Sequence, residues 1–132
     1  MGSAFVYALP KDTVQQSAFE RYMDKVCNST GILKAELTSH SRRYENVNLR
    51  QILMCVARHE YGLTTTRIGE IFHRNHATII HASKKIKSIL GDEILLKQHP
   101  HLQQCLCIAD EEFNNEHGHY FQELDKWLIQ KK

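Results

Sequence analysis

The sequence predicts an all-α protein, and three observations support this fold class. Apolar residues recur every three or four positions along nearly the whole chain, which is the spacing of helices that pack on a core. Few stretches alternate between apolar and polar residues, as half-buried strands do. Only Pro10 and Pro100 are present to interrupt helices among the 132 residues. We expect a chain of this length to form one compact helical domain with appended helices.

Three helices are expected in the first half of the chain. The first covers 13–27, starts at a cap from Asp12 or Thr13, stops at the polar segment 28–31, and buries one stripe: Val14, Ala18, Tyr22 and Val26. A short helix over 32–37 precedes a polar, basic loop over 38–48 whose arginines reach outward. The third helix covers 49–61, stops at Gly62 and buries Leu49, Ile52, Leu53 and Val56.

The segment 64–90 is expected to form a helix-turn-helix. Threonine hydroxyls at 64–66 can cap a short helix that ends near His73 and Arg74 and carries Ile68, Ile71 and Phe72. After a tight turn, Asn75 is a good cap for a helix over 76–90, whose core side holds Ile79, Ala82, Ile86 and Ile89. A short helix, a tight turn and a longer helix in this order are typical of the motif.

The remainder of the chain divides into two extensions. Residues 1–12 precede the domain, which we place at 13–96, and residues 97–132 form a helical extension with a net charge of −2. One amphipathic segment of this extension carries Leu102, Leu106, Ala109 and Phe113, and a second carries Phe121, Leu124 and Leu128. The extension is expected either to pack back on the domain or to hold a protein partner or a second copy through Tyr120, Phe121 and Trp127.

Positive charge is concentrated in the middle of the chain. Residues 40–87 carry nine Lys and Arg against three Glu, a net charge of +6, whereas the whole chain carries +2. Such a basic segment is typical of proteins that bind a polyanion. No apolar run approaches the roughly 20 residues of a membrane span, no secretory signal is evident, and the four cysteines lack the spacing of a disulfide scaffold. We therefore expect a cytoplasmic protein without a membrane partner.

The outward face of the 76–90 helix has an unusual composition for a solvated surface. Opposite the apolar stripe lie Ala77, Ile80, His81, Lys84 and Ser88. Small apolar groups can contact thymine methyls in a major groove, and Lys and His can donate to bases or phosphates. Free backbone N–H groups at 76–78 favour phosphate contacts. From these residues alone, an ordinary surface with Ile80 covered by the C-terminal extension is an equal alternative.

A longer motif surrounds this helix. Residues 71–86 read IFHRNHATIIHASKKI, preceded by Ile68-Gly69 and, earlier, by Leu49-Arg50-Gln51. This sequence resembles the C-terminal DNA-binding domain, domain IV, of the bacterial replication initiator DnaA. The signature of that family runs Gly-Arg-Asp-His-Thr-Thr-Val and, after one apolar residue, His-Ala-Cys-Arg-Lys-Ile. The chain matches it at Arg74, His76, Thr78, His81, Ala82, Lys85 and Ile86.

The resemblance extends over about 22–90 and implies a Trp-repressor-like helix-turn-helix that binds double-stranded DNA, at sites like the DnaA box. Arg50 takes the place of the arginine that family members send into the minor groove. Arg74, Thr78 and Lys85 fall where phosphates are contacted, and His76 and Ile80 fall where bases are approached. The expected DNA-binding set is Arg50, Thr66, Arg74, Asn75, His76, Ala77, Thr78, Ile80, His81, Lys84 and Lys85.

Departures from the signature bear on the DNA sequence that is recognised. The family's Asp is Asn75 here, its first Thr is Ala77, and Thr66 replaces a proline at the start of the helix before the turn. Asparagine can still cap the helix, but it lacks the carboxylate that can accept a hydrogen bond from cytosine. It could instead pair with adenine through two hydrogen bonds. The target can therefore differ from the family's preferred box.

The sequence contains no phosphate-binding loop of the form Gly-x-x-x-x-Gly-Lys-Ser/Thr, so we expect no ATPase, nucleotide or cofactor. The expected function is that of a DNA-binding accessory or regulator of replication or transcription, in a bacterial nucleoid or a phage-infected cell, and not that of an enzyme. The alternative is a protein-interaction module derived from a DNA-binding domain, which docks a partner such as the initiator.

Histidine and cysteine pairs near the C-terminus are the other candidates for chemistry. The pairs His99-x-His101, Cys105-x-Cys107 and His117-x-His119 could offer zinc ligands, but their spacing fits none of the usual zinc patterns. A catalytic Cys-His pair or a carboxylate nuclease site built from Cys105, Glu111, Glu112 or His117 would have no distinctive motif. We therefore expect no metal site and no catalytic residue.

Overall fold

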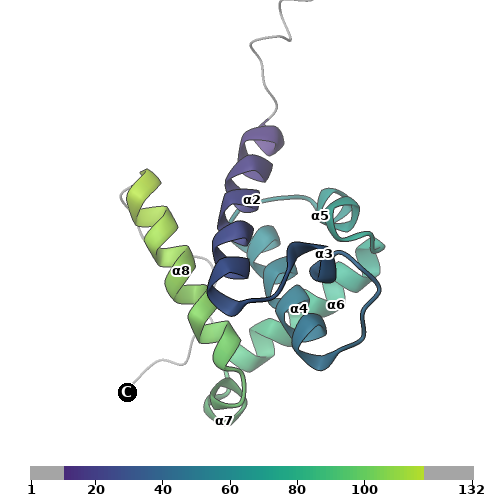
Figure 1. Cartoon of the computed structure of the whole chain (residues 1–132), viewed down its shortest axis with the longest axis vertical. Helices are drawn as coiled ribbons and strands as arrows, with labels where there is room; N and C mark the ends of the chain where they lie inside the picture. The colour runs from purple at the N-terminus through teal and green to yellow at the C-terminus, as the bar shows by residue number, and fades with distance from the viewer. Residues whose placement is uncertain (1–10, 118–132) are drawn as a thin grey trace, which may run out of the picture.

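The computed structural model describes residues 11–117 and the side chains of residues 14–108, and these residues form helices joined by short turns (Figure 1). In chain order the helices are α2 (Lys11–Thr30), α3 (Lys34–Leu37), α4 (Tyr44–His59), α5 (Thr65–Phe72), α6 (His76–Leu90), α7 (Glu93–Lys97) and α8 (Pro100–His117). The described residues include no strand, and the predicted all-α class is confirmed. The predicted segment with Phe121, Leu124 and Leu128 lies outside the described residues.

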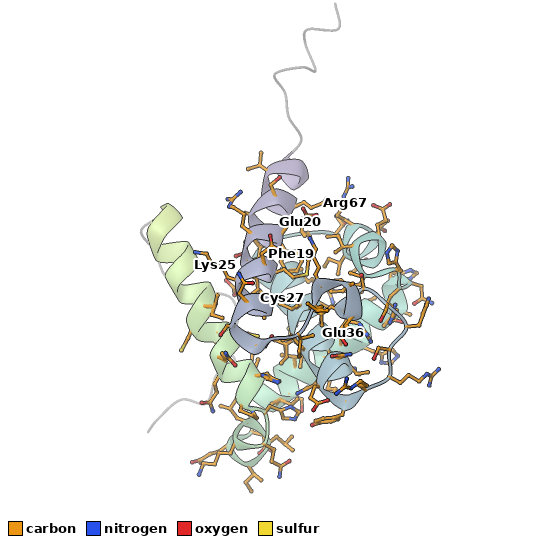
Figure 2. All side chains as sticks on the ribbon, viewed as in Figure 1. Phe19, Glu20, Lys25, Cys27, Glu36 and Arg67 are labelled. Atoms are coloured by element: carbon orange, nitrogen blue, oxygen red, sulfur yellow. The ribbon has the colours of Figure 1, made fainter. Side chains whose placement is uncertain are left out.

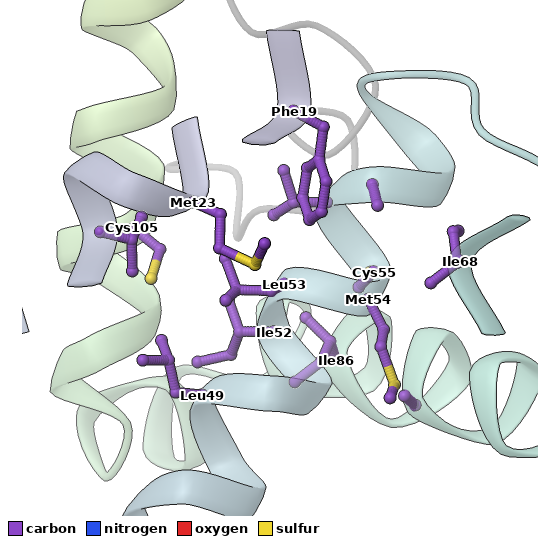
Figure 3. Packing of buried hydrophobic residues seen from close by; sticks show 14 of the residues in the cluster. Phe19, Met23, Leu49, Ile52, Leu53, Met54, Cys55, Ile68, Ile86 and Cys105 are labelled. Atoms are coloured by element: carbon purple, nitrogen blue, oxygen red, sulfur yellow. The ribbon is translucent and has the colours of Figure 1, made fainter. Parts of the chain in front are cut away.

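Helix α2 turns most of the predicted stripe to the core. Tyr22 and Val26 are fully buried and Ala18 packs partly buried against the core, as expected, but Val14 is 57% exposed. Phe19 and Met23 are fully buried instead (Figure 3), and the Phe19 ring packs edge-on against Tyr61 at a centroid distance of 5.5 Å. The larger side chains determine the rotation of the helix, because burying them removes more apolar surface from water than burying Val14 would.

Helix α4 is the central element, and the predicted loop over 38–48 is wrong in its second half. The helix starts at Tyr44, five residues before the predicted start. Asn46 and Asn48 in this first turn are only 3% and 5% exposed, and Asn46 Nδ2 donates to Ser41 Oγ at 3.0 Å. Burial of polar side chains therefore stabilises this helical turn, and the spacing of apolar residues in the sequence does not reveal it. Further along, the side chains of residues 52–57 are all fully buried.

Helices α5 and α6 form the predicted helix-turn-helix. Thr64 Oγ1 accepts from the backbone N of Arg67 at 3.1 Å and caps α5, and Asn75 caps α6. Between them His73 adopts the left-handed conformation with φ 59°, and the backbone N of Arg74 donates to Gly69 O at 2.9 Å. A Cβ at position 69 would lie 2.3 Å from the Arg74 carbonyl oxygen, so this close turn requires glycine.

The chain after α6 returns to the core. Asp92 Oδ1 accepts from the backbone N of Ile94 and Leu95 and caps α7, a short helix that the sequence pattern did not predict. Helix α8 then lies alongside α2, and Figure 3 shows its Cys105 among the core side chains. Leu102 and Cys105 are fully buried, and Tyr22 Oη donates to Cys105 O at 3.1 Å. No helix in residues 11–117 is long and apolar enough to span a membrane.

Candidate nucleic-acid interface

One face of α6 packs on the core and the opposite face is open. Ile79, Ala82 and Ile86 are at most 1% exposed and pack in the core with α4 and α5, as predicted. On the other side, the predicted outward residues Ala77, His81, Lys84 and Ser88 are exposed, and Ile80 is half-buried. His76, Thr78 and Lys85, which were predicted as DNA contacts, are exposed as well. This face combines cations and donors with small apolar groups, which is the mixture that a major groove accommodates.

The start of α6 and the preceding turn border a hollow of about 490 Å³. Its lining comprises Thr66, Gly69, Glu70, His73, Arg74, Asn75 and His76. Thr66 thus lies across from Asn75 and His76 although nine residues separate it from Asn75 in the sequence. The carboxylate of Glu70 pairs with Arg67, labelled in Figure 2, at 3.4 Å, which offsets its negative charge at this rim.

Asn75 is committed to the cap of α6 through its oxygen. Asn75 Oδ1 accepts from the backbone N of Thr78 at 3.1 Å and from Thr78 Oγ1 at 3.2 Å. Both residues are nevertheless exposed. The cap therefore holds both side chains in place at the N-terminal end of the open face.

Arg74 is half-buried and tied to backbone carbonyls. Its Nη1 donates to Phe72 O at 2.9 Å and to His73 O at 3.2 Å, and its Nη2 donates to Ser39 O at 2.7 Å. These bonds fix the left-handed turn and join it to the loop over 38–43. The guanidinium therefore has a structural task in addition to the phosphate contact predicted for it.

Arg50 lies inside the fold and not on the open face of α6. Its side chain is 5% exposed, and its Nε donates to Leu37 O at 2.7 Å. Its Nη2 donates to Ser41 O at 3.1 Å and, at 3.4 Å each, to the carbonyl oxygens of Glu36 and Ser39. Burial, together with the nearby charge of Arg74, lowers the pKa of Arg50. To enter a DNA groove, the side chain would have to leave these carbonyls.

The exposed Arg42 and Arg43 agree with the prediction that the arginines of the loop before α4 reach outward. Two contacts of the region were not predicted from the sequence. Arg74 Nη2 donates to Ser39 O and ties the loop to the α5–α6 turn. Gln51 Oε1 accepts from Lys85 Nζ at 3.0 Å, so the amide orients a lysine of α6. No sequence signal pointed to either contact, because the paired residues lie on separate elements.

The cysteine pair of α8 is divided between the core and the surface. Cys105 is buried and Cys107 is exposed on the same helix. Within the described part of the chain, no three His, Cys, Asp or Glu side chains are grouped as a metal ion would require. His117 lies beyond the residues whose side chains are described.

Residues 19–86 match the family described as the bacterial DnaA protein helix-turn-helix. The chain belongs to this family. Among curated DnaA relatives, the chromosomal replication initiator of Pseudothermotoga lettingae is 30% identical over 89 residues, which cover 66% of this chain and 20% of that protein. The initiator of Thermoanaerobacter sp. strain X514 is 37% identical over 76 residues, covering 57% of this chain and 17% of its own length. No solved structure matches the chain.

The DnaA match coincides with the helices that build the open face. It begins at Phe19 in α2 and ends at Ile86 in α6, so it includes the whole helix-turn-helix up to the last turn of α6. The chain spans about a fifth of the length of these DnaA relatives. Membership of a DnaA helix-turn-helix family supports DNA binding by this segment.

Proposed function

We propose that the chain binds duplex DNA in a sequence-specific manner by placing α6 in the major groove. The observation that carries the proposal is the open face of α6, which lies in the DnaA-family helix-turn-helix and presents donors and small apolar groups together. A buried stripe on the other side, with Ile79 and Ile86 at 0% exposure, leaves this face no role in the described core. Positive charge around it favours approach to a polyanion.

The side chains divide into two groups by their chemistry and position. His76, Ala77, Ile80 and His81 face bases, with apolar contacts to thymine methyls and donors for base acceptors. The second group contacts phosphates, and comprises Thr66, Arg74, Lys84 and Lys85. Thr78, predicted from the sequence for the same group, donates its hydroxyl hydrogen to Asn75 Oδ1 and stays with the cap. We keep the minor-groove contact predicted for Arg50 only for a DNA-bound state in which the side chain has left its carbonyl partners. Asn75 belongs to the first group.

We further propose a cytoplasmic accessory role without catalysis. The 132 residues contain no nucleotide-binding loop of the Gly-x-x-x-x-Gly-Lys-Ser/Thr type, and the family match lies in the helix-turn-helix. A chain that binds DnaA-like sites without ATP would occupy them in competition with an initiator, or regulate transcription beside them. Its action then depends on occupancy of DNA and not on turnover.

Fluorescence anisotropy tests the DNA-binding proposal. The wild-type chain is titrated with a DnaA-box duplex and a scrambled duplex at two salt concentrations, together with Lys85→Ala and His76→Ala. Lys85→Ala should weaken binding to both duplexes alike and lower the salt slope by about one, whereas His76→Ala should reduce discrimination by about 1 to 3 kcal/mol. Lys97→Ala is the matched control, because Lys97 is an exposed lysine on α7 that pairs with Glu93.

The outcomes separate the classes of function. Selective binding that weakens with salt and is unchanged in Lys97→Ala supports the proposal. Weak, equal binding of the box and the scrambled duplex shows that the box is not the target, and selection from random DNA then follows. Negligible affinity for any duplex at low salt contradicts DNA binding itself.

A further inference from the structure

We propose that Asn75 determines one base of the DNA site, selecting a base with a hydrogen-bond acceptor on its major-groove edge, such as guanine or thymine, over cytosine, which presents only an amino donor there. The inference rests on the proposed function, because it concerns the DNA that α6 contacts. It goes further by assigning the chemical class of one base to one side chain.

The side-chain oxygen of Asn75 already accepts two hydrogen bonds within the protein. A carbonyl oxygen has two lone pairs, and Asn75 Oδ1 accepts from the backbone N of Thr78 at 3.1 Å and from Thr78 Oγ1 at 3.2 Å. The orientation of the amide follows from chemistry, since the backbone N–H of Thr78 can only donate and must face the oxygen. The adenine pairing considered from the sequence needs this same oxygen as an acceptor, and the cap withholds it.

The amino group of the side chain faces away from the helix. With Oδ1 turned to Thr78, Nδ2 is the outer end of the side chain, and it donates no hydrogen bond within the described part of the chain. Asn75 is exposed and borders the hollow shared with Thr66 and His76. To a ligand, this residue therefore offers a donor and no acceptor, at the edge of the open face.

The last step is the match to the groove. On the major-groove edge, guanine O6 and N7, thymine O4 and adenine N7 are acceptors, whereas cytosine presents only the N4 amino donor. A donor-only side chain can therefore hydrogen-bond to guanine, thymine or adenine, but leaves two donors opposed with cytosine. An aspartate at this position would reverse the preference, because one carboxylate oxygen could cap Thr78 while the other accepts from an amino group.

Selection from a random duplex library tests the inference on the full chain and two variants, Asn75→Asp and Asn75→Ser. Both replacements are good N-caps, so α6 should start at the same residue, which circular dichroism checks. The wild type should deplete cytosine at one position where Asn75→Asp enriches it. Asn75→Ser, whose side chain is short, should lose the preference at that position and keep the rest of the site.

Titration of duplexes that differ only at this base should give about a tenfold preference that reverses between the wild type and Asn75→Asp. An enriched site that is the same in the wild type and in Asn75→Asp overturns the inference and leaves the proposed function standing. A wild type that enriches no sequence overturns the proposed function, and the inference with it.

Discussion

At the scale of single residues, Arg50 and Arg74 show that a motif position does not determine what a side chain does in the free protein. The DnaA-like pattern predicts both as DNA contacts, yet both donate to Ser39 O and hold the loop over 38–43. The sequence contained a signal for Arg50, because it lies on the buried helical face three, four and seven residues before Leu53, Met54 and Ala57. The longer-range partners, at sequence separations of 9 to 35 residues, could not be read from any local pattern.

Arg50→Ala should lower the free energy of unfolding by about 3 kcal/mol, because it removes charge-assisted hydrogen bonds and leaves the buried Leu37 carbonyl oxygen without its donor. Arg42→Ala, which changes an exposed arginine of the held loop, should change it by less than about 0.5 kcal/mol. Urea unfolding of the three proteins measures both values. Unchanged stability of Arg50→Ala with loss of DNA binding would instead make the side chain a direct DNA contact.

Burial also determines how the protein responds to alkaline pH. Burial raises the pKa of the Cys55 and Cys105 thiols from 9.0 to about 12, so the unfolded chain releases these protons first. The free energy of unfolding should therefore fall as the pH rises above 9.0 toward 12. Between about pH 8 and about pH 10.5, the free energy of unfolding of Cys55→Ala should fall by on the order of 2 kcal/mol less than that of the wild type. Equal losses in urea titrations at the two pH values would contradict this assignment.

At the scale of secondary-structure elements, the sequence predicts best where a cap and an apolar stripe agree. Helix α6 has the predicted bounds, because Asn75 supplies a local cap and Ile79, Ala82 and Ile86 fall on one face. The start of α4 was missed because its first turn is stabilised by the burial of Asn46 in the folded protein. A polar residue gives no sign of such burial in the sequence. Helix α7 was missed because five residues are too few for a helical repeat.

The α5–α6 turn is the element on which the proposed interface depends most. Gly69→Ala should lower the free energy of unfolding by about 2 kcal/mol and weaken DNA binding, because its Cβ would meet the Arg74 carbonyl oxygen at 2.3 Å and displace the start of α6. Gly91→Ala is the matched control, since φ is −88° there and alanine adopts that conformation. Thermal unfolding and anisotropy measure the two effects, and normal DNA binding by Gly69→Ala would show that the turn can shift without moving the open face.

At the scale of the whole molecule, the core and the candidate site are assembled from parts that the sequence presents separately. The all-α class and the helix-turn-helix could be predicted, because periodicity and caps are local. The apposition of the loop over 38–43 with the α5–α6 turn could not, because it arises from side chains that reach backbone carbonyls across the fold. Polar anchoring of this kind has no periodic signature.

The packing of α8 could not be predicted from a local pattern either. This helix begins 14 residues after the segment matched by the DnaA family, and it contacts α2. Leu102→Ala should lower the free energy of unfolding by about 3 kcal/mol, because Leu102 is fully buried in the shared core. Cys107→Ala changes an exposed residue of the same helix and should have an effect below about 0.5 kcal/mol. Equilibrium urea unfolding of both variants at several protein concentrations makes the comparison. A loss that does not depend on concentration would mean that α8 completes the core of its own chain, whereas a negligible effect of Leu102→Ala would make α8 dispensable to the fold and leave its apolar residues for a partner.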